Sequence, residues 1–302
     1  MQIKSFLKLI RLPNVLTAAC NSLAGAFCAG AGFERWPDLL AIAFASMSLY
    51  AAGIVLNDLF DLDEDRLDRP TRPLPSGAVK IWVASAFACF FSVAGCILAS
   101  SVSSQIGQIA LAILAAVVSY DAFLKKTPAG PWAMGLCRGL NLAMGLAFAP
   151  LQAWSFIAIL AYIIYISGIT YISRQETNSG QTKGVFRGFV LMVAGIAAVL
   201  AVILLRSGLL KKFNNGLSTI HIATLISILI LIILLKIISN AYRSAMANPT
   251  PETIQKLVKI GIISLPIIDT SLVLALSFFI FALPLIVIWL IARLTARKLY
   301  TT

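Results

Sequence analysis

The sequence has 302 residues, of which 60% are hydrophobic and only 12% are charged, and its mean hydropathy is +0.93. A soluble domain carries about 25% charged residues, so this composition excludes an ordinary soluble protein and indicates a helical bundle in lipid. The net charge is +12, but the basic residues lie mostly in short gaps between apolar runs. This distribution excludes nucleic acid as a partner, because nucleic-acid-binding proteins gather basic residues on one polar face.

The N-terminal segment places Lys4, Lys8 and Arg11 before the first apolar run, as a signal peptide does. No small-residue cleavage pattern is set off from that run, so we expect a retained first transmembrane helix. A spanning helix needs about 20 mostly apolar residues. The runs that meet this condition predict spans at 12–31, 36–56, 79–100, 105–124, 131–150, 154–173, 184–205, 218–238 and 271–292.

These spans predict an all-α fold, a polytopic transmembrane helical bundle of about nine helices that forms a single domain over residues 1–302. The stretch 255–268 is apolar but short, so it is expected to be a half-helix or a partial span. With a cytoplasmic N-terminus, most of the 24 Lys and Arg residues fall on the inner side, which favours that orientation. The C-terminal Arg293, Arg297 and Lys298 would then lie outside, so either the span count is off by one or the tail tolerates that side.

Acidic residues concentrate at one place in the chain. Half of the 12 lie in one short segment, namely Asp58, Asp61, Asp63, Glu64, Asp65 and Asp68. An acid at the centre of a membrane helix costs about 2.5–3.5 kcal/mol, so this concentration needs a reason. A solvated loop is one interpretation, and the spacing and the neighbours of the acids argue against it. Asp58, Asp61 and Asp65 are spaced i, i+3 and i+7, which predicts one helix face, and Asn57 adds a neutral oxygen there. Because carboxylates on one face repel each other without a cation, and because oxygen ligands suit hard ions, the segment predicts a Mg²⁺ site.

Three arginines, Arg66, Arg69 and Arg72, lie among and after these acids. One interpretation is an internal salt-bridge network. The other is that Arg69 or Arg72 holds phosphate oxygens that the metal also binds. Mg²⁺ bound by few carboxylates usually takes its remaining ligands from water and substrate phosphates.

Several stretches carry a resemblance to a known family. NDLFDLDED at 57–65 and RPTRPLPSG at 69–77 are similar to the first aspartate-rich motif of the UbiA family of intramembrane prenyltransferases. RLPN at 11–14 resembles the family's start, YDAFLKK at 120–126 its YxxxLK segment, and GLCRGLN at 135–141 the opening of its fifth helix. The resemblance extends to about residue 190 and, by helix count, over the whole chain.

The resemblance implies helices around a central cavity that faces the cytoplasm and opens sideways to membrane lipid, here expected to be the bacterial inner membrane. It implies Mg²⁺-dependent transfer of a prenyl group from a prenyl diphosphate to an aromatic or other lipophilic acceptor. Carried over by position, it assigns Mg²⁺ binding and catalysis to Asp58, Asp61 and Asp65, with Asn57 as a further Mg²⁺ ligand. It assigns diphosphate contacts to Arg72 and Lys125. Arg138 and Asn141 would form the pocket wall, and Asn14 would contact the acceptor.

The segment after the predicted sixth helix departs from the family pattern. Family members carry two Asp there, four residues apart, which add Mg²⁺ ligands. This chain reads YISRQETNSG at 171–180, in which only Glu176 is acidic, and Gln175 and Asn178 offer neutral oxygens. We expect a weaker second metal site, with Arg174 replacing a cation in binding phosphate, although a drifted loop is the alternative. The pattern resembles the EboC branch of the family.

The depleted second motif leaves another function open. This alternative is a non-catalytic UbiA-like membrane protein that binds or carries an isoprenoid phosphate or a secondary-metabolite precursor. An ion-coupled transporter ranks last, because a second acidic cluster is missing from the sequence. Asp269 is an isolated acid between Pro266 and an apolar run, and we expect it to cap the N-terminus of the last helix rather than to reach the cavity.

Overall fold

The computed structural model describes residues 3–176, 182–207 and 219–300, and every regular element in them is helical, which confirms the all-α prediction. The elements in chain order are α1 (Ile3–Leu9), α2 (Leu12–Cys28), η1 (Phe33–Arg35), α3 (Trp36–Phe60), α4 (Leu62–Asp68), α5 (Ile81–Val102), α6 (Ser104–Ser119), the π-helical turn η2 (Tyr120–Leu124), α7 (Gly130–Leu146), α8 (Ala153–Ser173), α9 (Thr182–Arg206), α10 (Thr219–Ala247), α11 (Pro251–Ile263), α12 (Leu265–Leu276), η4 (Phe279–Phe281) and α13 (Ala282–Tyr300).

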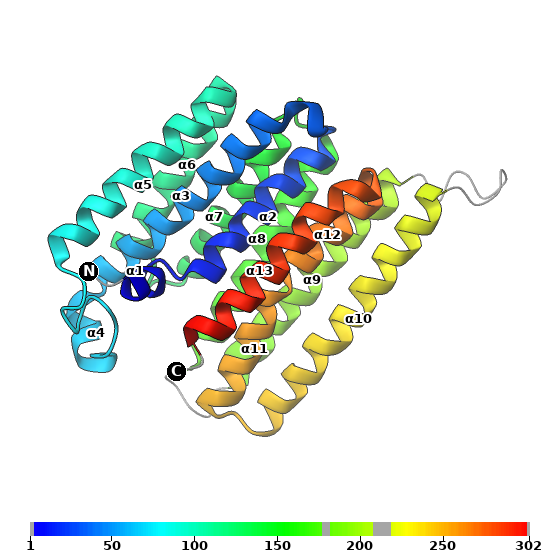
Figure 1. Cartoon of the computed structure of the whole chain (residues 1–302). Helices are drawn as coiled ribbons and strands as arrows, with labels where there is room; N and C mark the ends of the chain where they lie inside the picture. The colour runs from blue at the N-terminus through cyan, green and yellow to red at the C-terminus, as the bar shows by residue number, and fades with distance from the viewer. Residues whose placement is uncertain (1–2, 177–181, 208–218, 301–302) are drawn as a thin grey trace.

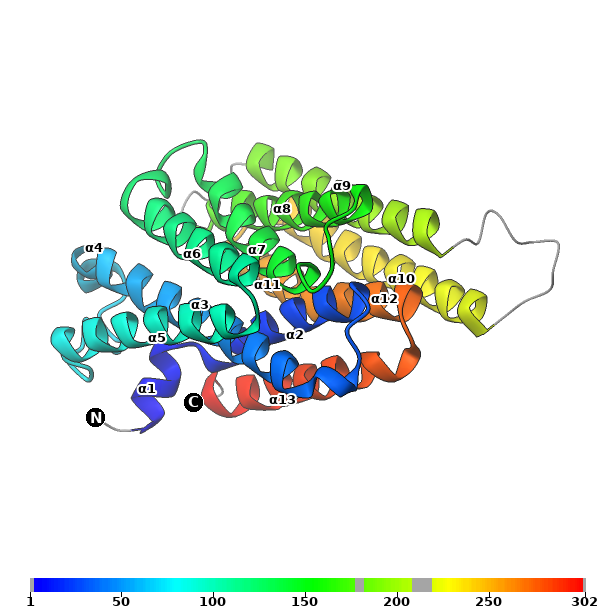
Figure 2. The same cartoon turned by 90° about the horizontal axis from the view of Figure 1, so that it is seen from above.

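The long helices run side by side in one bundle, and the short helices α1 and α4 lie at the same end of it (Figures 1 and 2). Among the described residues, eight helical stretches are long and apolar enough to cross a membrane. The helices α2 and α7 are shorter, with 17 residues each, and run alongside the others. The polytopic transmembrane prediction is therefore confirmed, and its count of about nine helices is approximate.

Prolines mark where several of these helices begin. Pro13, Pro37, Pro131, Pro251 and Pro266 each occupy one of the first two positions of a helix. Proline suits that place because its fixed φ is already helical and its missing N–H would have no partner inside the helix. These starts set the ends of α2, α3, α7, α11 and α12, and with them the level at which each helix carries its polar residues.

The C-terminal part differs from the predicted spans. The predicted span 271–292 is wrong, because α12 ends at Leu276 and Ser277 has extended backbone with φ −138° and ψ −172°. The apolar stretch 255–268 belongs instead to α11 and α12, which together form one candidate span over Pro251–Leu276. The chain thus turns once more than predicted, and α13 returns beside α2 so that both termini lie at one end (Figures 1 and 2).

A buried polar cluster lies among the central helices. Asp269 is fully buried, and its Oδ1 accepts hydrogen bonds from Asn21 Nδ2 at 2.9 Å and Tyr162 OH at 2.6 Å. Asn141 Nδ2 in turn donates to Asn21 Oδ1 at 3.1 Å. The prediction that Asp269 caps the last helix is wrong, because this residue lies inside α12, whose N-cap is Ser264.

Candidate functional site

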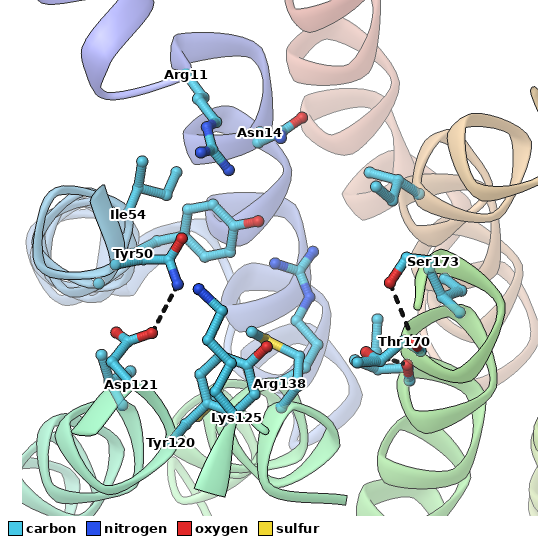
Figure 3. Close-up of a pocket in the computed structure, with 18 of the residues that line it drawn as sticks. Arg11, Asn14, Tyr50, Ile54, Tyr120, Asp121, Lys125, Arg138, Thr170 and Ser173 are labelled. Atoms are coloured by element: carbon cyan, nitrogen blue, oxygen red, sulfur yellow. Dashed lines mark hydrogen bonds between the residues drawn. The ribbon is translucent and has the colours of Figure 1, made fainter. Parts of the chain in front are cut away.

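A cavity of about 410 Å³ lies between α2, α3, α6, α7, α8 and α11, beside η2 (Figure 3). Its polar lining consists of Arg11, Asn14, Asn57, Asp61, Arg69, Arg72, Asp121, Lys125, Arg138 and Asn141. Its apolar lining includes Leu49, Ile54, Ile113, Val117, Ile166 and Ile169. Most of the charged groups come from helix ends, from η2 and from the connections between helices, whereas the apolar groups come from helix interiors. Such a cavity suits an amphiphile with an anionic head.

The acidic segment bends at its centre. The helix α3 ends at Phe60, Asp61 has φ −91° and ψ 4°, and α4 begins at Leu62. The acids therefore do not share one unbroken helix face, because Asp61 leaves the α region of backbone space. Asp58 and Asp65 are buried at 4% exposure each, while Asp61 lines the cavity.

Arginines bind the two buried carboxylates. Arg11 pairs with Asp58 at 2.8 Å, and Arg72 lies between Asp58 at 3.6 Å and Asp65 at 2.5 Å. Arg69 approaches Asp65 at 4.0 Å. The predicted salt-bridge network is thus present for Arg69 and Arg72, and Arg66 pairs with Asp63 at 2.8 Å. It does not exclude phosphate binding, because Arg69 and Arg72 also line the cavity.

Lys125 and Asp121 complete the polar end of the cavity from η2. Lys125 Nζ donates to Asp61 Oδ2. Asn57 Nδ2 donates to Asp121 Oδ1 at 2.7 Å, the bond marked by the dashed line at Asp121 in Figure 3. The sequence reasoning placed Lys125 here but missed Asp121. The available signal was an acid isolated inside an apolar span, where a charge is costly without a function or a partner.

Arg11 is the other residue of this end that the sequence reasoning left out of the site. Its φ of +49° is the only positive value among the non-glycine residues that the structure describes. This left-handed backbone separates α1 from α2 at the residue that binds Asp58. The signal in the sequence was the RLPN stretch, in which only Asn14 was assigned a role.

Arg174 serves a turn and not the cavity wall. Its guanidinium donates to the backbone carbonyls of Lys125 and, at 2.9 Å, Thr127. These bonds engage donors that were predicted to hold phosphate. Glu176 is half-buried, and burial raises the pKa of its carboxyl, while the nearby Arg69 charge and a hydrogen bond with Gln255 oppose that rise. Asn178, the remaining candidate of this segment, lies outside the described residues.

Three further predicted residues lie deeper or at the side of the cavity. Asn14 and Arg138 line it (Figure 3). Asn141 also lines it, but protein groups engage both ends of its amide. Its Nδ2 donates to the Ala18 carbonyl at 3.0 Å, and its Oδ1 accepts from Ser46 at 2.6 Å. Asn141 therefore fixes the wall of the cavity.

The oxygen donors at the polar end bear on the predicted Mg²⁺ site. Within the described ranges, no group of three acidic, His or Cys side chains is arranged to hold a metal. Asn57, Asp61 and Asp121, which carry side-chain oxygens, nevertheless line the cavity. A few hard oxygen donors fit a Mg²⁺ ion that keeps water and substrate phosphate as its other ligands. The metal set Asn57, Asp58, Asp61 and Asp65 stays a prediction.

Solved structures share this fold. A structure of digeranylgeranylglyceryl phosphate synthase gives a TM-score of 0.62 at 23% identity and covers 91% of this chain and 98% of that one. A UbiA homologue from Aeropyrum pernix K1 gives 0.62 at 18% identity, with 85% and 96% covered. A UbiA homologue from Archaeoglobus fulgidus bound to GPP and Mg²⁺ gives 0.55 at 14% identity, with 99% and 100% covered.

Sequence relatives agree with the fold. A digeranylgeranylglyceryl phosphate synthase of Sulfurisphaera tokodaii is 28% identical over 257 residues, which cover 78% of this chain and 89% of the relative. The synthase of Sulfolobus acidocaldarius is 25% identical, with 81% and 91% covered. The model of the UbiA prenyltransferase family matches residues 18–244. The assignment to the EboC branch stays a prediction. Because the family model matches most of the sequence, the chain belongs to the UbiA prenyltransferase family.

Proposed function

We propose that this chain transfers a prenyl group from a prenyl diphosphate to a lipid acceptor inside the membrane. The observation that carries the proposal is the division of the cavity. Arg69, Arg72 and Lys125 meet carboxylates at its polar end, and branched apolar side chains form most of the remaining wall. The polar end suits a diphosphate head, and the apolar wall suits an isoprenoid chain.

The residues at the polar end account for how the prenyl group would leave. As the allylic C–O bond breaks, the diphosphate gains negative charge, and the donors of Arg72 and Lys125 stabilise it. The acceptor forms a bond to the same carbon and releases its proton, so that prenylated acceptor and diphosphate are the products. The apolar wall keeps water from trapping the allylic cation, and the ring of Tyr50 offers it a π-face.

Mg²⁺ bound to the diphosphate would neutralise further charge on the leaving group. Asn57, Asp61 and Asp121 would hold it, since these three residues line the cavity and carry side-chain oxygens. In the same proposal, Asp58 and Asp65 fix the positions of Arg11 and Arg72. After these ion pairs rearrange, Asp58 and Asp65 would also bind Mg²⁺. The homologue bound to GPP and Mg²⁺ supports this choice of ion.

The acceptor is proposed to carry a glyceryl phosphate. Two relatives named above are digeranylgeranylglyceryl phosphate synthases, and that name supports a phosphate-bearing lipid rather than the aromatic acceptor that the resemblance implied. A glyceryl phosphate with one geranylgeranyl chain is therefore the acceptor to test first, with geranylgeranyl diphosphate as the donor.

The proposal is tested with purified protein in lipid nanodiscs, both substrates and MgCl₂. Prenylated lipid is measured by mass spectrometry, and released diphosphate is measured separately. Wild type should form both products, and Asp61→Asn should lower kcat by roughly 100- to 1,000-fold, the effect of removing one charge-stabilising group. Removing Mg²⁺ with a chelator should stop turnover, and adding Mg²⁺ back should restore it.

Glu64→Gln is the matched control. Glu64 lies in the same acidic segment, but it is exposed and pairs with the exposed Lys126, whose hydrogen bond and charge lower the pKa of the Glu64 carboxyl. An exposed pair contributes little, so kcat should stay within about twofold of wild type. Equal turnover in Asp61→Asn and wild type would refute the proposal. Donor binding without either product would instead support the non-catalytic carrier, which the named relatives do not favour.

A further inference from the structure

Arg138 on α7 differs from the other cationic side chains of the cavity. Arg11, Arg69, Arg72 and Lys125 each pair with a carboxylate of the acidic segment. Arg138 belongs to none of the ion pairs formed by the described residues. It is only 6% exposed, and its Nε is buried without a hydrogen-bond partner in the described part of the chain.

The guanidinium of Arg138 is directed into the cavity. Figure 3 shows it rising from α7 between Tyr50 and Thr170. Its Nη2 donates to the Thr17 carbonyl at 2.8 Å, and its Cζ lies 5.7 Å from the centre of the Tyr50 ring. These contacts fix where the charge lies while leaving donors of the guanidinium without a protein acceptor.

Arg138 lies deeper than the polar end. On α3, its contact Tyr50 precedes Asp58 by about 12 Å at 1.5 Å per residue. On α2, its contact Thr17 follows Arg11 by about 9 Å on the same scale. Two helices thus place the Arg138 charge roughly 10 Å inward of the Arg11–Asp58 pair, at a level separate from the group that suits the diphosphate.

The buried polar cluster behind Arg138 explains how its charge is tolerated. An intramembrane charge is costly without compensation, and the carboxyl of Asp269 interacts electrostatically with Arg138. Asp269 nevertheless gives its Oδ1 to Asn21 and Tyr162 and forms no ion pair with Arg138. Asp269 therefore offsets the charge of Arg138 without using its N–H donors.

We propose that Arg138 is the centre of a second anion subsite, which binds the phosphate or carboxylate of the acceptor. This inference rests on the proposed prenyl transfer and specifies its substrate class, namely an acceptor with an anionic group rather than a neutral one. The donor diphosphate occupies the outer level and the acceptor anion the inner level. The reacting carbon of the donor and the nucleophile of the acceptor then meet between two fixed anions, beside Tyr50.

Arg138→Met tests the subsite, because it removes the charge and retains an unbranched apolar stem. The acceptors are a geranylgeranyl-bearing glyceryl phosphate, 4-hydroxybenzoate for a carboxylate, and the neutral geranylgeranylglycerol. In Arg138→Met the KM of the anionic acceptor used by wild type should rise roughly 10- to 100-fold, as expected for loss of a charged hydrogen bond. The Kd of geranylgeranyl diphosphate, measured without acceptor, should change less than about threefold.

Arg138→Lys is the charge-retaining companion and should keep most of the preference for the anionic over the neutral acceptor. A measurement on wild type covers the case that Arg138→Met does not fold. Glycerol 1-phosphate should compete with the anionic acceptor and leave the Kd of geranylgeranyl diphosphate unchanged. Competition against the diphosphate instead would overturn the subsite.

The outcomes separate this inference from the proposed function. Failure of wild type to form product with any of the acceptors refutes the prenyl transfer itself. Turnover in wild type combined with an unchanged acceptor KM in Arg138→Met refutes the subsite alone. A parallel rise in acceptor KM and diphosphate Kd also refutes it, because Arg138 would then belong to the diphosphate site.

Discussion

Two glycines let α2 and α7 cross with their backbones in contact. A Cβ atom added to Gly145 would overlap the Ser22 carbonyl oxygen, and one added to Gly25 would lie 2.5 Å from the Leu142 carbonyl oxygen. Membrane helices often pack through such small residues, because lipid gives helices little hydrophobic reason to associate and close contact must replace it. The crossing holds Thr17 and Asn21 against Arg138 and Asn141.

Gly145→Ala should therefore lower the free energy of unfolding by about 1–3 kcal/mol, the usual cost of overfilling a packed interface. The measurement is the thermal unfolding midpoint in detergent. Gly184→Ala is the control, because the three described atoms nearest to a Cβ there belong to the outer part of the flexible Gln175 side chain. Equal midpoints for Gly145→Ala and wild type would show that the backbones are not constrained at this crossing.

Individual residues show what the sequence could and could not predict. A functional role for the acidic segment was predictable, because charges are rare and costly in an apolar chain. Asp61 of this segment and Lys125 do line one cavity. Their partners were not predictable, because Arg11 and Asp58 are 47 positions apart and meet only through the fold. Asp269 was misplaced for the same reason, since an isolated acid before an apolar run looks like a cap until its buried partners are known.

At the scale of elements, Arg174 connects the end of α8 to the turn that carries Lys125. Its guanidinium donates to the carbonyls of Lys125 and Thr127. Gly130 leaves room for this guanidinium, since a Cβ at position 130 would overlap Arg174 Nη2. The turn η2 is a single π-helical turn, a geometry that often marks functional positions. Arg174 thus holds the backbone from which Lys125 reaches Asp61.

Arg174→Gln should raise the Kd of geranylgeranyl diphosphate by roughly 10- to 100-fold, because small displacements of a binding group have effects of that size. The effect should act through Lys125. In a double-mutant cycle, Arg174→Gln should therefore add little to Lys125→Met. Lys126→Met, at the exposed neighbour of Lys125, is the control and should bind like wild type. Full additivity of Arg174→Gln and Lys125→Met would mean that Arg174 contacts the diphosphate itself.

The boundaries of the elements were predictable only in part. The runs that became α3, α5, α8 and α9 were located from hydropathy, because each is long and flanked by polar residues. The break after Leu276 was not, since Ser277 lies in a continuous apolar run without a proline or glycine at that position. The bend at Asp61 was hidden for a similar reason, because the spacing of the acids is compatible with one helix.

For the whole molecule, the additional turn before α13 removes the conflict in the charge distribution. The helix α13 carries Arg293, Arg297 and Lys298, and its C-terminal end lies at the end of the bundle that holds α1 and α4 (Figure 1). The basic residues on the short connections at this end also include Arg69, Arg72 and Lys125. Positively charged connections face the cytoplasm in most membrane proteins.

We therefore expect the polar end of the cavity and both termini to face the cytoplasm. The test uses a cysteine-free version of the chain into which one cysteine is introduced, either Ser76→Cys after α4 or Ala153→Cys at the start of α8, both exposed positions. In intact cells, a membrane-impermeant maleimide should label Ala153→Cys directly and Ser76→Cys only after permeabilisation. A C-terminal reporter that folds only in the cytoplasm should be active in the same protein. Labelling of Ser76→Cys in intact cells would show that the polar end faces away from the cytoplasm. An inactive reporter together with a protected Ser76→Cys would show that the C-terminal end of α13 lies on the side opposite to the polar end.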